Sequence, residues 1–576
     1  MRNVYLAQVN YQFGNNVFLP YSVGCLQVYA QSIPAIAANY IFKELLFLRE
    51  SPDQVIARME SPDVLGLSCY QWNWEWNRIL AERVKAKWPQ CLIVIGGPQV
   101  PNSPDIEIPW ADTRVLNEGE ESFAGILLAR LEHRPVKGRI DSPRIEAPDK
   151  LPSPYIMRVF DWLLTRYPQY EFHATSETHR GCPYACSFCD WGSAIYTKVR
   201  PFSDRRVRAE YLWMAQHKIE LVYNADANFA MLPRDKGLID FLIHLKVAWG
   251  YPKQIRAAWA KNSTQRTFQL AARLDGAGMN KGVTLALQSL NEPTLKAIKR
   301  QNIKWDDWQK LAAQYQESQV ATYTELIMGL PEETLETFKA GIDQLLEAGQ
   351  HNGLNIYFCS LLPNSEMSTP AYRAKYGLKS HRIPLLQNHA SIDPQAITEY
   401  GDYVVSTKTS DTISLALFAW AIQCFHTLGL TQHLARKAFE KGIKYSDLYQ
   451  SLLDYLHWLP IGDPAGEEYR YAQHALFQAL VVEAPLGGLD HRFGNVFWPI
   501  EEMTYLRIMA RGVGYFYEAI EPWLKTLGLN SEIDTQAAML RTPDDFGGDL
   551  ERYAREVVWF GRKGGFFLKE LANVSL

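Results

Sequence analysis

The hydrophobic pattern of the first 130 residues alternates between short apolar runs and amphipathic segments. Three apolar runs, 3–10, 63–70 and 91–98, are strand candidates, and 113–123 runs from a strand into an acidic turn. Between the second and third runs, residues 77–89 repeat apolar positions at helical spacing. Strands that are apolar along their whole length, separated by helices, are typical of a parallel sheet covered on both faces. We therefore predict a doubly wound, Rossmann-like α/β domain over residues 1–135.

A second alternating series follows a proline-bearing segment, 136–170, which we interpret as a linker. It contains six strand candidates: 171–178, 219–229, 254–263, 282–290, 321–331 and 353–364. Helical patterns such as 204–218 and 293–300 separate them. Six strand–helix units joined by right-handed crossovers predict an incomplete barrel of the (β/α)6 type, a partial TIM barrel, over residues 171–384.

The last third of the chain has a different pattern. Long helical stretches such as 411–430 predict a mainly α-helical C-terminal domain over residues 385–576. No basic-then-apolar leader opens the chain, and no run of about 18 apolar residues could span a bilayer. We therefore expect no membrane partner.

Composition narrows the class of protein. The 576 residues are 47% hydrophobic and 21% charged, with a net charge of −4. Because this balance lacks a basic excess, it argues against broad electrostatic capture of nucleic acid, and we expect no nucleic-acid partner. Eight cysteines spread over this length do not form a secreted disulfide framework, so we expect a cytoplasmic protein.

Three of the eight cysteines lie close together, directly after the first strand candidate of the barrel. Cys182, Cys186 and Cys189 fall within eight positions. They could be buried structural thiols, or zinc ligands with His179 completing a Cys3His set. They could also hold a [4Fe-4S] cluster through three thiolates, with one iron left open. The loop spacing has no packing reason and structural zinc usually draws ligands from two separate loops, so we favour the cluster.

The cysteine spacing also carries a family resemblance. Cys-x3-Cys-x2-Cys after the first strand of a partial barrel resembles the radical S-adenosylmethionine (SAM) superfamily, and Phe188 is the aromatic residue which that family prefers beside the adenine. The resemblance implies a [4Fe-4S] cluster on the three cysteines and SAM bound at the open iron. A single electron, from a donor of the flavodoxin or ferredoxin type, would then cleave SAM to a 5′-deoxyadenosyl radical.

The resemblance implies further SAM contacts on the later strands. In the turn of the second strand, Asp226 and Asn228 would accept hydrogen bonds from the amino group, although the turn departs from the commoner Gly-Gly-Glu form. The other contacts are expected at the ends of the fourth and fifth strands: Gln288 and Ser289 for the carboxylate or ribose, Ile327 and Gly329 for the adenine.

The N-terminal domain resembles the cobalamin-binding domain that precedes the barrel in one large subgroup of the family. Ser68, the pair Gly96-Gly97 and the run NEGEESF at 117–123 carry this resemblance, because glycines at a strand end let a ligand approach the backbone closely. The Asp-x-His-x-x-Gly that supplies a histidine to cobalt in many cobalamin proteins is absent from this domain.

Four aromatic residues lie where a corrin ring would be expected, after the second strand: Tyr70, Trp72, Trp74 and Trp76. They could cradle the ring or fill its place. Cobalamin is therefore a cofactor that the domain allows, and a retained sheet that binds no cobalamin is the alternative.

The solitary Cys359 lies late in the sixth strand candidate, at the end where barrel active sites lie. Alternation along the strand predicts that Asn355, Tyr357 and Cys359 share one face. A lone cysteine is usually a small buried hydrophobic residue. This position and the layout of the whole chain nevertheless resemble the peptide epimerases of the proteusin pathways, in which a cysteine late in the barrel donates a hydrogen atom.

These observations support three hypotheses about function. The first is a radical SAM epimerase, an isomerase that converts residues of a ribosomally made precursor peptide from L to D. The adenosyl radical would remove a Cα hydrogen and Cys359 would return one. The alternative is a cobalamin-dependent radical SAM C-methyltransferase, which predicts a methyl-sized mass gain and S-adenosylhomocysteine. A third, of another class, is a non-catalytic metal- or cobalamin-binding protein.

Overall fold

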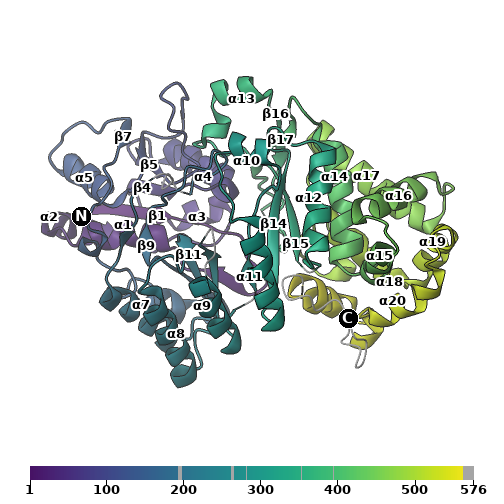
Figure 1. Cartoon of the computed structure of the whole chain (residues 1–576). Coiled ribbons are helices and arrows are strands. Elements are labelled where there is room, and N and C mark those ends of the chain that lie inside the picture. The colour runs from purple at the N-terminus through teal and green to yellow at the C-terminus, as the bar shows by residue number, and fades with distance from the viewer. Residues whose placement is uncertain (192–196, 261–264, 281, 352, 394, 562–576) are drawn as a thin grey trace. The chain divides into compact units, whose positions relative to one another are not determined.

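The computed structural model describes residues 1–191, 197–260, 265–280, 282–351, 353–393 and 395–561 (Figure 1). Contacts between residues divide the chain into two compact units. The first unit is Met1–Asn280 with Leu362–Thr369 and Asp393–Tyr400, and the second unit is Lys281–Leu361 with Pro370–Ile392 and Gly401–Leu576. The four-part division above stays a prediction. Residues 261–263 of a predicted strand and 562–576 of the predicted helical domain lie outside the described residues.

A six-stranded sheet opens the first unit. Its strands are β1 (Arg2–Ala7), β3 (Tyr40–Phe42), β4 (Pro62–Ser68), β5 (Leu92–Gly96), β6 (Thr113–Leu116) and β7 (Arg139–Asp141). Their order is β3-β1-β4-β5-β6-β7, and every neighbouring pair is parallel. The predicted doubly wound α/β sheet is confirmed. The short strands β3 and β7 were not predicted, because three residues are too few to show a period.

Helices cover both faces of this sheet. They are α1 (Tyr21–Gln31), α2 (Pro34–Asn39), α3 (Pro52–Arg58), α4 (Trp74–Lys87) and α5 (Glu120–Leu131). Leu65 and Leu67 of β4 belong to the core that also contains Trp76 of α4, whereas Gly66 lies against Phe123 of α5. Successive residues of a strand point to opposite faces, so the two faces of β4 pack against different helices.

The segment 136–170 includes regular structure. It contains β7, which pairs with β6, and the helix α6 (Asp161–Arg166). The proline-rich composition gave no signal of this three-residue edge strand or of the short helix, and the interpretation of 136–170 as a linker stays a prediction.

The first three strands of the barrel series form a second parallel sheet in the first unit. β8 (Glu171–Ser176), β11 (Leu221–Phe229) and β12 (Gln254–Trp259) are joined by the unpredicted β2 (Asn16–Phe18), in the order β12-β11-β8-β2. The helices α7 (Asp204–Gln216), α8 (Asp235–Trp249) and α9 (Gln265–Gly276) follow β8, β11 and β12. Ser203 begins α7, where its hydroxyl accepts a hydrogen bond from the backbone N–H of Arg206.

The other three strands of the series lie in the second unit. β13 (Val283–Thr284), β14 (Thr322–Met328) and β15 (Leu354–Phe358) form a parallel sheet in that order. The helices are α10 (Glu292–Ala297), α11 (Trp305–Glu317) and α12 (Leu335–Glu347). The predicted fourth strand, 282–290, is regular over two residues only. Its remainder still pairs with β14, because the N–H groups of Leu285 and Leu287 donate to Tyr323 and Glu325.

The remainder of the second unit is mainly helical, as predicted (Figure 1). A short sheet of β16 (Lys379–Pro384) and β17 (Tyr400–Ser406) and the helix α13 (Pro370–Tyr376) precede this part. The helices are α14 (Thr412–Ala421), a π-helical turn (Ile422–Thr427), α15 (Gln432–Glu440), α16 (Tyr445–Trp458), α17 (Pro464–Val482), α18 (Ile500–Arg511), α19 (Gly514–Thr526), α20 (Ile533–Met539) and α21 (Leu550–Tyr553).

Among the described residues, no single helix has both the length and the apolar character needed to cross a membrane. One bent pair, Thr412–Thr427 with Gln432–Glu440 at 97°, meets the length and composition requirements only when the two parts are taken together.

Candidate functional site

The cysteine loop begins where β8 ends. β8 pairs in parallel with β11, so the carboxyl ends of the two strands lie next to each other. Two short strands then close the loop at its base: β9 (His179–Arg180) pairs antiparallel with β10 (Arg200–Pro201). The carbonyl of Cys182 also accepts a hydrogen bond from the N–H of Thr197, at 2.7 Å. The loop that bears the three cysteines is therefore anchored at both ends.

Gly181 is required by the way the two ends of the loop meet. Its φ is +101°, and a Cβ added to it would lie 2.2 Å from the carbonyl oxygen of Lys198. Only glycine tolerates both conditions. The residue directly before the first cysteine is thus determined by the close approach of two backbone segments.

The three predicted cluster ligands lie in this loop. Cys182 and Cys186 are each 2% exposed, and Cys189 is half-buried. The N–H of Cys189 donates to the carbonyl of Cys186 at 3.1 Å, which forms a tight turn between them. Phe188, predicted beside the adenine, is half-buried in the same turn. The structure therefore brings these four predicted residues into one short, anchored segment.

The donor set fits an iron–sulfur cluster. Three thiols in one loop are the ligands that such clusters take, and the side-chain amide of Asn228 donates a hydrogen bond to Sγ of Cys182 at 3.3 Å. A fully buried amide aimed at a sulfur is the kind of outer contact that stabilises a thiolate ligand.

The alternative of a zinc site was also tested against the geometry. Across the part of the chain that the structure describes, no three His, Cys, Asp or Glu side chains are arranged to hold one metal ion. A zinc ion would need its thiolates about 2.3 Å from a single centre. The ring of His179 has Nδ1 at 3.3 Å from Oγ1 of Thr178 and 3.4 Å from Asp226, and its buried Nε2 has no hydrogen-bond partner among the described residues. The three sulfurs do not converge on one centre, as a Cys3His site would require.

Asp226 holds the residues that lead into the loop. Its carboxylate accepts hydrogen bonds from the N–H of Thr178 at 2.8 Å, the hydroxyl of Thr178 at 2.5 Å and the N–H of His179 at 3.1 Å. A carboxylate with three such donors positions the backbone at the end of β8. Contact of Asp226 and Asn228 with the SAM amino group stays a prediction, and the structure gives both side chains a second role at the loop.

The predicted contacts of the fourth and fifth strands gather at one end of the second unit's sheet. The N–H of Gln288 donates to Glu325 at 2.9 Å, and its carbonyl accepts from Ile327 at 2.8 Å. Ser289 donates its hydroxyl to the buried carboxylate of Glu333 at 2.5 Å. Burial raises the pKa of Glu333, and the hydrogen bond from Ser289 opposes part of this rise. The Ser289 hydroxyl thus already has a hydrogen-bond partner within the protein.

Cys359 lies just past the end of β15, beside Gly329. Its N–H donates to Met328 at 3.0 Å and its carbonyl accepts from Val404 at 2.9 Å, so it links β14 to β17. A Cβ on Gly329 would lie 3.7 Å from that of Cys359. Burial raises the pKa of the Cys359 thiol to about 12, so the thiol stays protonated at neutral pH.

The prediction of one shared face for Asn355, Tyr357 and Cys359 needs correction. Asn355 and Cys359 are buried, whereas Tyr357 is 45% exposed. The regular strand ends at Phe358, so simple alternation does not extend to Cys359.

The carboxyl ends of β4 and β5 carry the predicted cobalamin-binding residues. The hydroxyls of Ser68 and Ser22 lie 2.9 Å apart, and Ser22 donates to the side-chain carbonyl of Gln8 at 2.7 Å. Gly97 has a φ of +104°, and a Cβ on it would lie 2.6 Å from the carbonyl oxygen of Cys69. A Cβ on Gly96 would meet only ordinary contacts.

The four aromatic residues after β4 separate into two groups. Tyr70 and Trp72 are half-buried and stacked, with ring centroids 4.5 Å apart. Trp74 packs edge-on against Trp110, and Trp76 is wholly buried in the core. The expectation that all four could cradle a corrin is therefore corrected to the Tyr70–Trp72 pair. The hydroxyls, the glycines and the half-buried aromatic pair lie at the carboxyl ends of neighbouring parallel strands, where ligands of such sheets bind.

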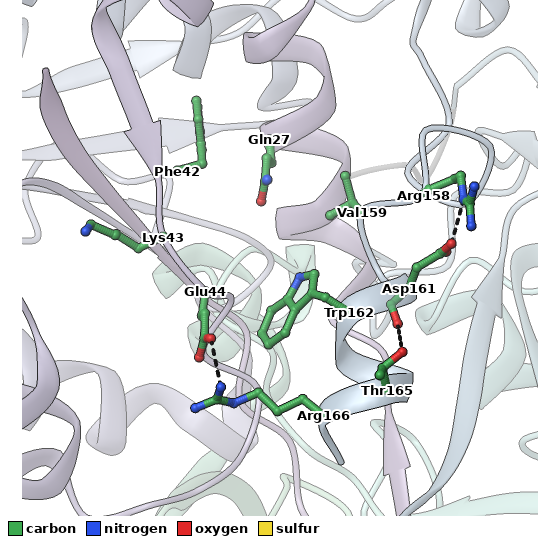
Figure 2. Close-up of a pocket in the computed structure, with 10 residues that line it drawn as sticks. All are labelled: Gln27, Phe42, Lys43, Glu44, Arg158, Val159, Asp161, Trp162, Thr165 and Arg166. Carbon is green, nitrogen blue, oxygen red and sulfur yellow. Dashed lines mark hydrogen bonds and ion pairs between the residues drawn. The ribbon is translucent and has the colours of Figure 1, made fainter. Parts of the chain in front are cut away.

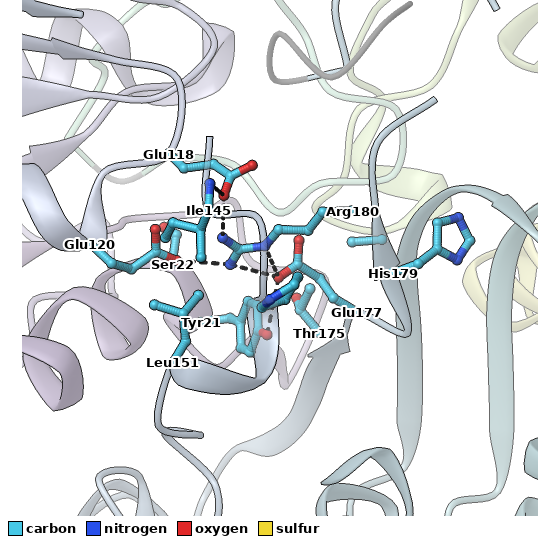
Figure 3. A network of polar contacts seen from close by, with 12 residues as sticks. Tyr21, Ser22, Glu118, Glu120, Ile145, Leu151, Thr175, Glu177, His179 and Arg180 are labelled. Atoms are coloured by element: carbon cyan, nitrogen blue, oxygen red, sulfur yellow. Dashed lines mark hydrogen bonds and ion pairs between the residues drawn. The ribbon is translucent and has the colours of Figure 1, made fainter. Parts of the chain in front are cut away.

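A buried ionic network was not predicted from the sequence. Arg180, two residues before Cys182, donates to three carboxylates: Glu118 at 3.4 Å, Glu120 at 2.8 Å and Glu177 at 3.0 Å (Figure 3). Glu118 lies in the turn after β6 and Glu120 is the first residue of α5, and both belong to the run NEGEESF that resembles cobalamin-binding domains. The acidic residues of NEGEE were the signal for this network in the sequence. They do not identify their partner Arg180, which lies 60 residues away from Glu120.

A pocket of about 870 Å³ opens in the first unit around Trp162 (Figure 2). Its three basic side chains already have acidic partners: Lys43 with Glu60, Arg158 with Asp161, and Arg166 with Glu44. None of the residues predicted for the site lines it. We therefore do not assign the chemistry to this pocket.

Comparisons with known proteins agree with this geometry. The family model described as the radical SAM superfamily matches residues 176–345. The chain is 33% identical to the cobalamin-dependent radical SAM methyltransferase TokK of Streptomyces tokunonensis, over 93% of this chain and 83% of that protein. It is 36% identical to the 2-(S-pantetheinyl)-carbapenam-3-carboxylate methyltransferase of Streptantibioticus cattleyicolor, over 90% of this chain and 81% of that protein.

Two solved structures share the fold. The cobalamin-dependent radical enzyme OxsB, with aqua-cobalamin and SAM bound, superposes with a TM-score of 0.56 and 14% identity over 98% of this chain and 84% of that chain. TsrM of Kitasatospora setae, with cobalamin and a [4Fe-4S] cluster bound, has a TM-score of 0.52 and 16% identity over 73% of this chain and 91% of that chain. Together with the parallel sheets and the helical C-terminal part, these likenesses confirm the predicted fold class.

Proposed function

Because this chain belongs to the cobalamin-dependent radical SAM enzymes, we propose that it is a methyltransferase that adds a methyl group to a carbon atom of a small carboxylate substrate. The observation that carries the proposal is the similarity to two methyltransferases over more than four fifths of their length. This is the second of our three hypotheses. Peptide epimerisation gains no support from these relatives.

The cofactors of the family are a [4Fe-4S] cluster, SAM and cobalamin. When bound, cluster-held SAM supplies the radical that activates the substrate carbon, and cobalamin supplies the methyl group. We assign the cluster to Cys182, Cys186 and Cys189, with Asn228 donating to one sulfur and Asp226 fixing the entry to the loop. We assign cobalamin to the sheet edge at Ser68, Gly96 and Gly97.

The remaining predicted residues would orient SAM. Phe188, Gln288, Ile327 and Gly329 are assigned to SAM as stated above, and Ser289 is assigned a supporting role through Glu333. One electron must reach the cluster for each turnover, so we propose a flavodoxin- or ferredoxin-type donor. Such donors are cytoplasmic, and we place the enzyme there.

The substrate class is taken from the relatives. One of them is named for 2-(S-pantetheinyl)-carbapenam-3-carboxylate, and we propose a substrate with the same combination of a bicyclic carboxylate and a thioether arm. The test uses anaerobically reconstituted protein with hydroxocobalamin, SAM, reduced flavodoxin and this carbapenam. We expect a product heavier by one methyl group, together with S-adenosylhomocysteine and 5′-deoxyadenosine.

Two variants sharpen this test. Cys186→Ala should lose bound iron and both coproducts, whereas Cys91→Ala, another buried cysteine, should keep its iron. A parallel reaction in D2O with a precursor peptide tests the first hypothesis. An inverted residue that carries solvent deuterium and no methyl group would overturn the methyltransferase proposal in favour of epimerisation.

A further inference from the structure

The buried network around Arg180 connects two parts of the first unit that the proposed function assigns to different cofactors. One part is the turn after β6, with Glu118, and the start of α5, with Glu120, at the sheet edge assigned to cobalamin. The other is the start of the cysteine loop, since Arg180 is followed by Gly181 and Cys182. Figure 3 shows the guanidinium of Arg180 lying between the carboxylates of the turn and that of Glu177.

The network is closely satisfied and largely shielded from water. Arg180 donates through Nε to Glu177 at 3.2 Å, through Nη1 to Glu118 and through Nη2 to Glu120 and Glu177. Tyr21 donates its hydroxyl to Glu177 at 3.2 Å. The side chain of Arg180 is 12% exposed and that of Glu120 is 6% exposed. Arginine suits this place, because its planar fork can donate to several carboxylates at once.

A second guanidinium reinforces the connection from the far end of the loop. Arg200, in β10, pairs with Glu118 and also donates to the carbonyl of Ile145. Burial alone would raise the pKa of Glu118, yet Arg200 and Arg180 hold it below its usual value. Both arginines belong to the strand pair that closes the loop, so the turn after β6 contacts the base of the loop at two points.

From this arrangement we infer that Arg180 is a positioning residue that couples the two cofactor sites, so that a protein with a loaded cluster binds cobalamin more tightly than one without. The inference rests on the proposed function. Ligation of the cysteines would hold the β9–β10 base of the loop, and with it Arg180 and Arg200, more firmly in the arrangement in which both contact the acidic side chains. Fixed Arg180 holds Glu118 and Glu120, so the turn at the cobalamin edge loses less freedom when cobalamin binds.

The coupling is measured by titrating hydroxocobalamin, followed by absorbance, into protein with and without its reconstituted cluster. For wild type we expect the cluster-loaded form to bind at least about fivefold more tightly. In Arg180→Met and in the milder Glu120→Gln, the ratio of the two affinities should fall towards one. Iron content is measured for every sample, so that a failure to load the cluster is seen directly.

The matched control is Arg206→Met. Arg206 is also shielded and ion-paired, with Glu210 at 3.1 Å, and it donates to the carbonyls of Pro148 and Leu151. Among the described residues, the ring of Phe202 is the only hydrogen-bond, ion-pair or ring partner that Arg206 shares with Arg180, so Arg206→Met should keep the wild-type ratio. If Arg180→Met does not fold, Glu120→Gln decides, because it is nearly isosteric.

The outcomes separate the two claims. Wild-type protein that binds cobalamin equally well with and without the cluster would overturn the inference alone. So would an Arg180→Met or Glu120→Gln protein that keeps the wild-type ratio. Wild-type protein that binds no cobalamin in either form would overturn the proposed function, and the inference with it.

Discussion

At the scale of single residues, the amide of Asn228 is the group that ties the second barrel strand to the cysteine loop. It lies in β11 with no exposed surface, and it donates to Sγ of Cys182. A hydrogen bond to a cluster sulfur stabilises the more negative, reduced state, because the sulfur carries more charge there. Asn228 would therefore tune the ease of cluster reduction in addition to any contact with SAM.

Replacement of Asn228 tests this role. Asn228→Ala should lower the midpoint potential of the cluster while leaving the iron content near wild type, measured by a redox titration followed by electron paramagnetic resonance. Asn224→Ala is the matched control, because Asn224 is buried in the same strand and its amide oxygen instead accepts from the N–H of Asp226 at 3.1 Å. Equal potentials for the two variants would contradict the role of Asn228.

At the scale of elements, the N-terminus of α4 is completed by a residue far along the chain. Glu399 accepts hydrogen bonds from the N–H groups of Glu75 at 2.7 Å and Trp76 at 3.1 Å. The first N–H groups of a helix have no partner within it, and a carboxylate there also interacts favourably with the helix dipole. Arg49 pairs with the same carboxylate at 3.1 Å and with Asp393 at 2.8 Å.

Removal of this cap should weaken the first unit. Glu399→Ala removes one carboxylate partner of Arg49 and the acceptor of two helix N–H groups, all of them buried. We therefore expect the free energy of unfolding to fall by about 3 kcal/mol or more. Urea unfolding followed by tryptophan fluorescence measures it, since Trp74 and Trp76 lie in the first turn of α4.

An exposed ion pair provides the control for this measurement. Arg134 and Glu132 are both more than half exposed, so Glu132→Ala should cost less than about 1 kcal/mol. A Glu399→Ala protein no less stable than Glu132→Ala would show that the contact does not support α4.

At the scale of the whole molecule, buried histidines make stability depend on pH. In the second unit, Nδ1 of His351 lies 3.1 Å from Nε2 of His426, and Nδ1 of His426 lies 2.8 Å from the hydroxyl of Tyr449. Two neutral imidazoles satisfy this chain of hydrogen bonds. Burial lowers the pKa of His351 to about 4, with Arg436 adding to the effect, and burial lowers that of His426 as well.

The sign of the pH dependence follows from these shifts. The usual pKa of histidine is 6.5, so between pH 6.5 and about 4 the unfolded chain binds more protons than the folded one. The stabilising contribution is complete above pH 6.5 and is lost as the pH falls, by at most about 3 kcal/mol for His351. His351→Gln should therefore flatten the decline in unfolding free energy between pH 7 and 4.

Urea unfolding at several pH values measures this slope. His133→Gln, at an exposed histidine, should keep the wild-type slope. A His351→Gln protein whose stability declines as steeply as wild type would show that the buried pair does not account for it.

The amino-acid sequence by itself determined the features that rest on local order. Apolar runs and helical periods predicted the principal strands of both parallel sheets, because burial on both faces imposes a pattern within a few residues. Short strands such as β2 and β7 were not predicted, since three residues show no period. The spacing of Cys182, Cys186 and Cys189 predicted the cluster loop, because the proposed ligands are neighbours in the chain.

Only the tertiary structure decided which distant groups meet. Arg180 reaches Glu120 across 60 residues, and Glu399 caps a helix 324 residues before it. Trp76 lies in the core while its neighbour Trp72 stays half-buried, although both stand in one aromatic run. Such pairings depend on which strand ends come together in the fold and on which buried polar groups still need a partner there. No local pattern of side chains carries that information.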